Sequence, residues 1–220
     1  MTILHVLFSS AALALLVGVT LFFFLRREER SMSAALEAGR SRSRWALVGG
    51  GESPVYYDLD KALANPTTAA RVVNLYEEMI NDLVNESGPV QRMAFIEKRR
   101  GPVGAITLKD LLVQRTGLPA VIVRPRRRIN CATVKGVANS GEKAIVVSDV
   151  ATSGGTVLEA VDKLESHGIR TVGVAVFLVR DRATEQAFGD RGIRLKYIAD
   201  QELLEKPASG ADVDRNLAVR

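Results

Sequence analysis

The sequence predicts an α/β fold with a mainly parallel sheet, preceded by a single transmembrane helix. Two observations predict the sheet and the helix. Short apolar runs alternate with helical patterns along most of the chain, and a long uncharged stretch opens it. The apolar runs are residues 93–96, 120–123, 144–147 and 171–179. Connections between such strands are expected to be right-handed crossovers.

The opening stretch, residues 3–25, contains no Lys, Arg, Asp or Glu over 23 positions. At about 1.5 Å per residue, such a helix crosses a hydrocarbon core of roughly 30 Å, so residues 1–25 are predicted to be a membrane anchor. The competing interpretation is a cleaved signal peptide, but that needs a basic start and a small-residue cleavage site. Nothing before Ile3 is charged, and the stretch closes on three phenylalanines.

Six arginines follow the anchor between residues 26 and 44. By the positive-inside tendency, they predict a single-pass protein of the inner or plasma membrane with its large carboxyl-terminal part in the cytoplasm. Residues 26–46 are predicted to be a basic juxtamembrane linker, either a helix or a flexible stalk. The chain has 30 Lys and Arg against 25 Asp and Glu. Because anionic lipid accounts for the excess near the anchor, no nucleic-acid partner is expected.

One domain is predicted over residues 47–206, followed by a polar, exposed tail over residues 207–220. Asn65 and Pro66 indicate a helix cap and a first helical residue. Apolar residues at helical spacing then predict a core-facing stripe: Ala69, Val73, Tyr76, Ile80 and Val84. With a single cysteine, Cys131, the chain has no internal disulfide, and with two histidines a histidine-based metal cluster is not expected.

The most informative stretch is AIVVSDVATSGGT, residues 144–156, in which a buried strand leads into a turn rich in hydroxyls and glycine. Ligands collect beyond the carboxyl ends of parallel strands. The glycines allow close approach, and the N–H groups that open the next helix favour a phosphate. Asp149 is then expected to face sugar hydroxyls or a magnesium ion.

The helix after this turn is predicted from Val157, Ala160, Val161 and Leu164, with Gly168 as its stop. A second interpretation of the turn needs no ligand. Thr156 and Glu159 have the spacing of a capping box, in which side chains satisfy the first N–H groups of the helix. Both interpretations remain open at this point.

The same stretch resembles the phosphoribosyl pyrophosphate (PRPP) motif of the type I phosphoribosyltransferases. The matching residues are Asp149, Thr152, Gly154, Gly155 and Thr156, and Ser153 lies among them. Ser148 stands where the family usually has a first carboxylate, so one charged contact to the ribose is replaced by a neutral one. The resemblance implies a Rossmann-like parallel α/β fold, PRPP as ligand, and Mg²⁺ bound with PRPP, with Asp149 as its candidate protein ligand.

Other segments are similar to orotate phosphoribosyltransferase in particular. Residues 49–63 resemble its amino-terminal S-G-x-x-S-P-x-Y-x-D region, although Val48 replaces an expected substrate-binding lysine. Residues 95–107 resemble its pyrophosphate loop, and the Asp181–Arg182 pair implies that Arg182 recognises the base. The residues assigned by this resemblance to the pyrophosphate side are Glu97, Lys98, Arg99, Arg100 and Gly101.

Residues 124–131 correspond to the mobile loop that closes over PRPP in the family, commonly from the other subunit of a dimer. The resemblance implies that Arg124 and Arg128 stabilise the leaving pyrophosphate, together with Asp149 as the catalytic group on the ribose side. Asn130 replaces a histidine, and arginine is a poor proton donor because it stays protonated. The competing interpretation is a solvated basic run, or a patch for anionic lipid or nucleic acid.

Two functional hypotheses follow. The first is a membrane-anchored enzyme of pyrimidine biosynthesis that converts PRPP and a nucleobase to a nucleoside monophosphate and pyrophosphate, as a homodimer or as a subunit of a membrane complex. The second is a non-catalytic PRPP or nucleotide sensor, or an accessory subunit, on the same fold. Three departures favour the second hypothesis: Val48, Ser148 and the arginine-rich loop. The intact turn and Arg182 favour the first.

Overall fold

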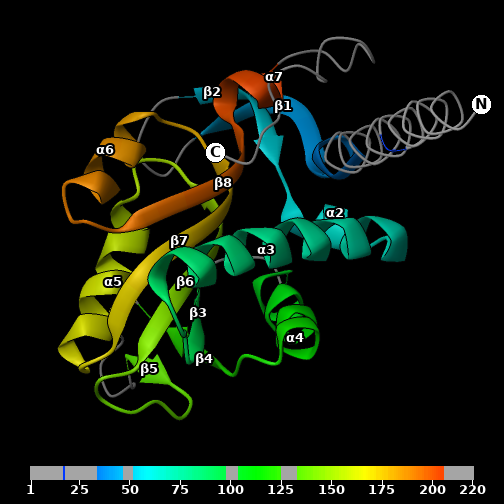
Figure 1. Cartoon of the computed structure of the whole chain (residues 1–220). Coiled ribbons are helices and arrows are strands. Elements are labelled where there is room, and N and C mark those ends of the chain that lie inside the picture. The colour runs from blue at the N-terminus through cyan, green and yellow to red at the C-terminus, as the bar shows by residue number, and fades with distance from the viewer. Residues whose placement is uncertain (1–16, 18–33, 47–51, 98–103, 125–132, 206–220) are drawn as a thin grey trace, which may run out of the picture.

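The computed structural model describes residue 17 and residues 34–46, 52–97, 104–124 and 133–205. Within these residues the main element is a six-stranded sheet of order β5-β4-β3-β6-β7-β8 (Figure 1). Its strands are β3 (Arg92–Ile96), β4 (Ala120–Val123), β5 (Val134–Lys135), β6 (Lys143–Ala151), β7 (Arg170–Val179) and β8 (Arg194–Asp200). All neighbouring strands pair in parallel except β4 and β5, which are antiparallel. The predicted α/β fold with a mainly parallel sheet is confirmed.

Each of the four apolar runs lies inside a strand of this sheet: β3, β4, β6 or β7. Strand β6 continues beyond its run to Ala151, so Ser148 and Asp149 belong to the strand rather than following it. Strand β8 was not predicted, because Arg194 and Lys196 interrupt its apolar residues. It lies at the edge of the sheet, where charged side chains can reach solvent and pair with helix α3 (Pro66–Ser87).

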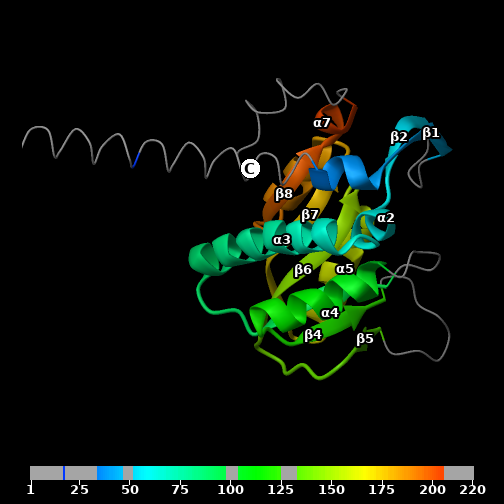
Figure 2. The ribbon, with the colours of Figure 1, turned by 90° about the vertical axis from the view of Figure 1, so that its right-hand side faces the viewer.

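Helices cover both faces of the sheet (Figures 1 and 2). One face packs against α2 (Leu59–Leu63), α3 and α4 (Gly104–Thr116), and the other against α5 (Gly155–Ser166) and α6 (Ala183–Gly189). The buried residues accordingly form two clusters, one on each side of the strands. Because both faces are covered, the central strands are mostly apolar, as parallel strands usually are.

The two helices predicted in detail form as expected. Asn65 caps α3, and its side-chain oxygen accepts hydrogen bonds from the N–H groups of Thr67 at 2.9 Å and Thr68 at 3.2 Å. The predicted stripe of α3 is buried, with Val84 only partly so. The predicted apolar residues of α5 are all buried, and that helix ends at Ser166, two residues before Gly168.

The amino-terminal region differs from the predicted linker. Residues 34–39 are helical, and β1 (Arg40–Ala46) pairs antiparallel with β2 (Glu52–Tyr57) in a separate two-stranded sheet beside α7 (Gln201–Glu205) (Figure 1). Ala35 and Leu36 are buried in the core. The boundary placed between residues 46 and 47 therefore falls inside a β-hairpin. The alternating Arg and Ser residues of β1 favoured the prediction of a solvated linker. The strand forms nevertheless, because backbone hydrogen bonds between strands do not require apolar side chains.

No helix in the described part of the chain is both long enough and apolar enough to cross a membrane. The predicted anchor, apart from Val17, lies outside the described residues, and so do residues 206–220, which include the predicted tail.

Candidate active site

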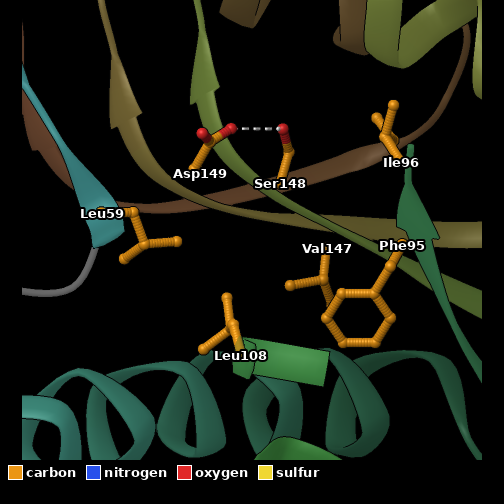
Figure 3. A pocket seen from close by; sticks show the side chains of 7 residues that line it. All are labelled: Leu59, Phe95, Ile96, Leu108, Val147, Ser148 and Asp149. Atoms are coloured by element: carbon orange, nitrogen blue, oxygen red, sulfur yellow. Dashed lines mark hydrogen bonds between the residues drawn. The ribbon is translucent and has the colours of Figure 1, made fainter. Parts of the chain in front are cut away.

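A small pocket opens at the carboxyl end of β6, the edge of the sheet at which the sequence predicted a ligand (Figure 3). Strands β3 and β6 and helices α2 and α4 contribute its lining: Leu59, Phe95, Ile96, Leu108, Val147, Ser148 and Asp149. Ser148 and Asp149 lie side by side in the upper part of the view, with Ile96 level with them and the other apolar side chains below (Figure 3). The position follows from the topology, since parallel strands end together at one edge of a sheet.

Ser148 and Asp149 form the polar side of this pocket. The Ser148 hydroxyl lies 3.5 Å from Asp149 Oδ1, and the same oxygen accepts a hydrogen bond from the Val150 N–H at 2.7 Å. Strand β3 pairs with β6 only as far as Phe95 opposite Val147, so the next two residues of β6 extend past their neighbour into the pocket. The strand thus presents one carboxylate and one hydroxyl, which suit the hydroxyls of a sugar.

The turn after β6 has the backbone geometry of a phosphate-binding loop. Gly154 has a φ of 72°, a left-handed conformation that a residue with a Cβ adopts only with strain, and α5 begins at Gly155. A Cβ at Gly154 would lie 3.2 Å from Thr184 and 3.1 Å from Phe188, both of which are fully buried on α6. The Thr184 hydroxyl also donates to the Thr152 carbonyl at 2.8 Å. Helix α6 therefore holds the turn from behind.

The capping-box interpretation of this turn is wrong. The cap position is Gly154, with no hydrogen bond from a cap side chain, so Thr156 is inside the helix and does not cap it. The first N–H groups of α5 are therefore left to a ligand or to water. Such an arrangement favours an anion, because these groups carry the positive end of the helix dipole.

Two buried tyrosines, Tyr57 and Tyr76, lie close enough to Asp149 for its charge to act on them. Burial raises the pKa of Tyr57 and of Tyr76 well above the ordinary value for tyrosine, and the charge of Asp149 raises both further. Each phenol therefore stays protonated at any pH at which the protein works. The helical spacing of Tyr76 predicts a core position but no role at the site, because a tyrosine in such a pattern carries no other signal.

On the predicted pyrophosphate side, Glu97 and Arg124 form an ion pair with each other. Arg124 Nη2 donates to Glu97 Oε1 at 3.0 Å, and Arg124 Nε donates to Oε2. The main chain reinforces the pairing, because the Glu97 N–H donates to the Val123 carbonyl at 2.8 Å. The remaining residues assigned to this side, Lys98 to Gly101, and the loop residue Arg128 lie outside the described residues, as does Val48.

Arg182, the predicted base-recognising residue, does not line the pocket. It precedes the first residue of α6, its side chain is 74% exposed, and its Nη2 lies 3.5 Å from Glu202 Oε2 on α7. Asp181 has a structural role beside it, accepting a hydrogen bond from the Ala183 N–H at 2.9 Å at the start of the helix. The structure thus groups Ser148, Asp149 and the turn, and leaves Arg182 on the surface between α6 and α7.

The oxygen atoms at this site suit a metal ion that is bound jointly by the protein and a ligand, rather than one that is enclosed by protein side chains. Among the described residues, no group of three or more His, Cys, Asp or Glu side chains is placed to hold a metal. Asp149 supplies oxygen atoms, which Mg²⁺ prefers, and Mg²⁺ commonly binds through one or two carboxylates and the phosphates of a substrate. The residues present therefore fit Mg²⁺ that arrives with a phosphorylated ligand.

The parallel sheet, the ligand pocket at its carboxyl edge and the phosphate turn define a type I phosphoribosyltransferase fold. Solved structures agree. The orotate phosphoribosyltransferase of Aeropyrum pernix superposes with a TM-score of 0.65 at 22% identity, over 79% of this chain and 96% of that one. The enzyme of Mycobacterium tuberculosis in complex with PRPP gives 0.59 at 22% identity, over 81% and 99%.

Sequence comparison narrows the class further. The chain is 30% identical over 188 residues to the orotate phosphoribosyltransferase of Thermococcus gammatolerans, covering 83% of this chain and 94% of that protein. The orotate phosphoribosyltransferase of Methanopyrus kandleri is 29% identical over 172 residues, covering 77% and 87%. No family model matches the sequence. The chain belongs to the orotate phosphoribosyltransferase family, which confirms the prediction of a phosphoribosyltransferase-type enzyme.

Proposed function

We propose that this protein transfers the phosphoribosyl group of PRPP to a pyrimidine base such as orotate. A bond forms between C1′ of the ribose and a ring nitrogen of the base, and the proton of that nitrogen is released to solvent. The bond from C1′ to the pyrophosphate oxygen breaks, and pyrophosphate leaves with the bonding electrons. One observation carries the proposal: Asp149 and the Gly154 turn lie together at the carboxyl end of β6, beside a pocket that Asp149 lines. The family of the chain supports it.

The proposed roles follow the geometry of the strand end. Asp149 and Ser148 accept and donate hydrogen bonds to the ribose hydroxyls, and residues 152–156 bind the 5′-phosphate through the N–H groups that open α5. Mg²⁺, bound with PRPP and near Asp149, would offset charge on the pyrophosphate. Arg182, which lies outside the pocket, is assigned to an acidic group on the base by the resemblance of the Asp181–Arg182 pair alone.

Arg124 and Arg128 are proposed to stabilise the charge that develops on the leaving pyrophosphate. Arginine stays protonated, so its contribution is electrostatic rather than the transfer of a proton. Arg124 is paired with Glu97, and pyrophosphate oxygens would compete with that carboxylate. Arg128 is assigned by the resemblance of its loop alone. The sensor hypothesis has no comparable support, because the relatives named above are transferases.

We propose further that residues 3–25 anchor the protein in the inner or plasma membrane, with the catalytic domain on the cytoplasmic side. The support is the uncharged sequence of 23 residues and the arginines that follow it. Membrane fractionation with alkaline carbonate extraction, and protease protection of the carboxyl-terminal domain, would test the anchor and its orientation separately. Release of the chain by carbonate would contradict the anchor.

The proposed reaction is tested on the full chain in detergent or nanodiscs. PRPP and Mg²⁺ are titrated by calorimetry, and pyrophosphate release is then measured with orotate, uracil and purine bases. Saturable binding with release dependent on orotate is the expected result. Binding without turnover on any base would instead support a sensor, and the absence of PRPP binding would contradict the proposal. Partial recovery of activity in mixed dimers of Arg128→Ala and Asp149→Asn chains would support a homodimer with shared sites.

A further inference from the structure

The hydroxyl of Tyr76 connects helix α3 to the ribose-binding end of β6. Tyr76 is completely buried, and its hydroxyl donates to the Ser148 backbone carbonyl at 2.7 Å, across 72 positions of sequence. The acceptor belongs to the residue that immediately precedes Asp149. A hydrogen bond from a buried side chain to this carbonyl therefore acts on the backbone from which the carboxylate extends.

This bond lies where the sheet supports β6 least. Pairing with β3 ends at Val147, whereas pairing with β7 continues through Ser148 opposite Val176 to Ala151 opposite Val179. Strand β3 itself ends one residue later, at Ile96, so Asp149 and the residues after it have a neighbouring strand on one side only. Tyr76 adds a contact from the helical layer at the first residue without a β3 partner.

The ring of Tyr76 is itself held in place. Phe177 of β7 lies 6.3 Å away, centroid to centroid, at 41°, and Tyr57 of β2 stacks on Phe177 at 4.4 Å and 13°. Tyr57 is anchored in turn, because its hydroxyl lies 3.4 Å from the Ala35 carbonyl. Packed aromatic rings have few alternative rotamers, so the hydroxyl of Tyr76 has a defined position.

The hydrogen bond from Tyr76 matters more because position 148 is a serine rather than a carboxylate. A second carboxylate would share the task of binding the ribose, but here Asp149 is the charged member of the pair and Ser148 the neutral one. The energy of a charge-assisted hydrogen bond depends on its geometry, so displacement of Asp149 would weaken its bond to the ribose. Because Ser148 is neutral, it cannot replace the lost charged contact.

We propose that Tyr76 is a positioning residue for ribose binding, which acts through the Ser148 carbonyl to set the orientation of Asp149. The ligand part of this inference rests on the proposed function. The structural part does not, because it concerns the order of β6 in the free protein. The two parts can be tested separately.

The test compares Tyr76→Phe with Tyr197→Phe in the full chain. Tyr197 is also a buried tyrosine with a hydrogen-bonded hydroxyl, which donates to Glu185 Oε1 at 2.8 Å, but it belongs to the core cluster on the other face of the sheet. Each variant removes one buried phenolic hydroxyl. Amide exchange at Val150, whose N–H donates to Asp149 Oδ1, reports the strand end without any ligand.

Tyr76→Phe is expected to speed exchange at Val150 by about tenfold relative to Tyr197→Phe, once both are corrected for global stability. It is also expected to raise the KM for PRPP by about three- to tenfold, with the KM for the base unchanged. If Tyr76→Phe does not fold, Phe177→Leu keeps the hydroxyl but removes the ring beside it, and the same increase in Val150 exchange is expected.

Equal exchange at Val150 in the two tyrosine variants would overturn the inference, and so would equal KM values for PRPP. If the wild-type protein binds no PRPP, the proposed function fails, and the exchange comparison still decides whether Tyr76 orders the end of β6.

Discussion

Arg124 and Glu97 form a two-point ion pair across the carboxyl ends of β4 and β3. Both residues were assigned to the pyrophosphate side from the sequence, but the pairing itself could not be anticipated. The Glu97 carboxylate accepts hydrogen bonds from the Arg124 guanidinium, which the proposed reaction uses to stabilise pyrophosphate. A carboxylate that binds through both oxygens resembles a phosphate in its contact with arginine. In the proposed reaction Glu97 would therefore compete with pyrophosphate for Arg124.

Glu97→Gln is expected to tighten binding of inorganic pyrophosphate by about two- to fivefold, since a partly exposed ion pair contributes about 0–1 kcal/mol. Arg124→Ala is expected to weaken the same binding. Calorimetric titration of pyrophosphate with Mg²⁺ measures both effects. Glu77→Gln is the control, because it breaks a similar pair with Arg115, which joins α3 and α4. Equal affinity in the Glu97 and Glu77 variants would remove Glu97 from the site.

Asp149→Asn is expected to weaken PRPP binding by about one to two orders of magnitude, because a charge-assisted hydrogen bond to ribose becomes a neutral one. The folded structure is expected to persist, since the amide oxygen can still accept from the Val150 N–H. Calorimetry and thermal unfolding measure the two properties. Unchanged affinity would show that the ribose binds elsewhere.

Ser148→Asp restores the carboxylate that this position usually has in type I phosphoribosyltransferases. Tighter PRPP binding, by up to about tenfold, is the expected outcome, together with lower stability of the free protein because two adjacent carboxylates repel each other. Ser148→Ala tests the hydroxyl alone and is expected to weaken PRPP binding modestly. An aspartate variant that binds PRPP less well than the wild type would contradict the assignment of Ser148 to the ribose.

Glu142 predicts a pH dependence of stability at the opposite edge of the sheet. Its hydrogen bond with Arg92 is the main cause that lowers its pKa from 4.5 to about 2, with a smaller contribution from Asn139. A lowered pKa in the folded state stabilises the protein above about pH 4.5, and this contribution is lost as the pH falls towards 2.

Glu142→Gln is accordingly expected to lower the Tm at pH 7, and the difference from wild type is expected to shrink below pH 4.5 and disappear near pH 2. Thermal unfolding across this range measures it. Glu165→Gln serves as a comparison, because Glu165 pairs with Arg191 on the surface. A Tm difference that is constant from pH 7 to pH 2 would exclude the ionised carboxylate as its cause.

The close packing of residues 34–39 predicts the cost of disturbing them. A Cβ at Gly39 would lie 2.4 Å from the ring of Tyr57, so Gly39→Ala is expected to lower the free energy of unfolding by about 1–3 kcal/mol. Gly189→Ala is the control, since a Cβ there meets nothing within 4 Å. Denaturant unfolding distinguishes them. Equal stability of the two variants would indicate that residues 34–39 are not part of the folded domain.

Local patterns were sufficient for much of the fold. The cap at Asn65, the buried stripe of α3 and the four apolar runs each follow from propensities and periodicities within one segment, so they could be predicted. The β1–β2 hairpin and β8 could not, because their residues are polar or alternate irregularly, and their pairing depends on partners elsewhere in the chain.

The candidate site divides in the same way. Ser148, Asp149 and the Gly154 turn lie within one short stretch of the chain, so their chemistry could be predicted from local sequence. The apolar pocket lining and the Tyr76 hydrogen bond join segments far apart in sequence, and no local signal marks them. Similarly, the pairing of Arg124 with Glu97 and of Arg182 with Glu202 depends on which strand and helix ends meet in space.

The sequence by itself determined the class of fold, the strand end proposed as the ligand site and the residues that give it a carboxylate and a glycine turn. These properties depend on backbone preferences and burial, which act over a few residues. Only the tertiary structure decided that α6 supports the turn and that Tyr76 contacts the strand end. It also decided that Arg124 pairs with Glu97 and Arg182 with Glu202. Such contacts arise from packing between distant segments, because distances in space are set by the whole sheet and its helices.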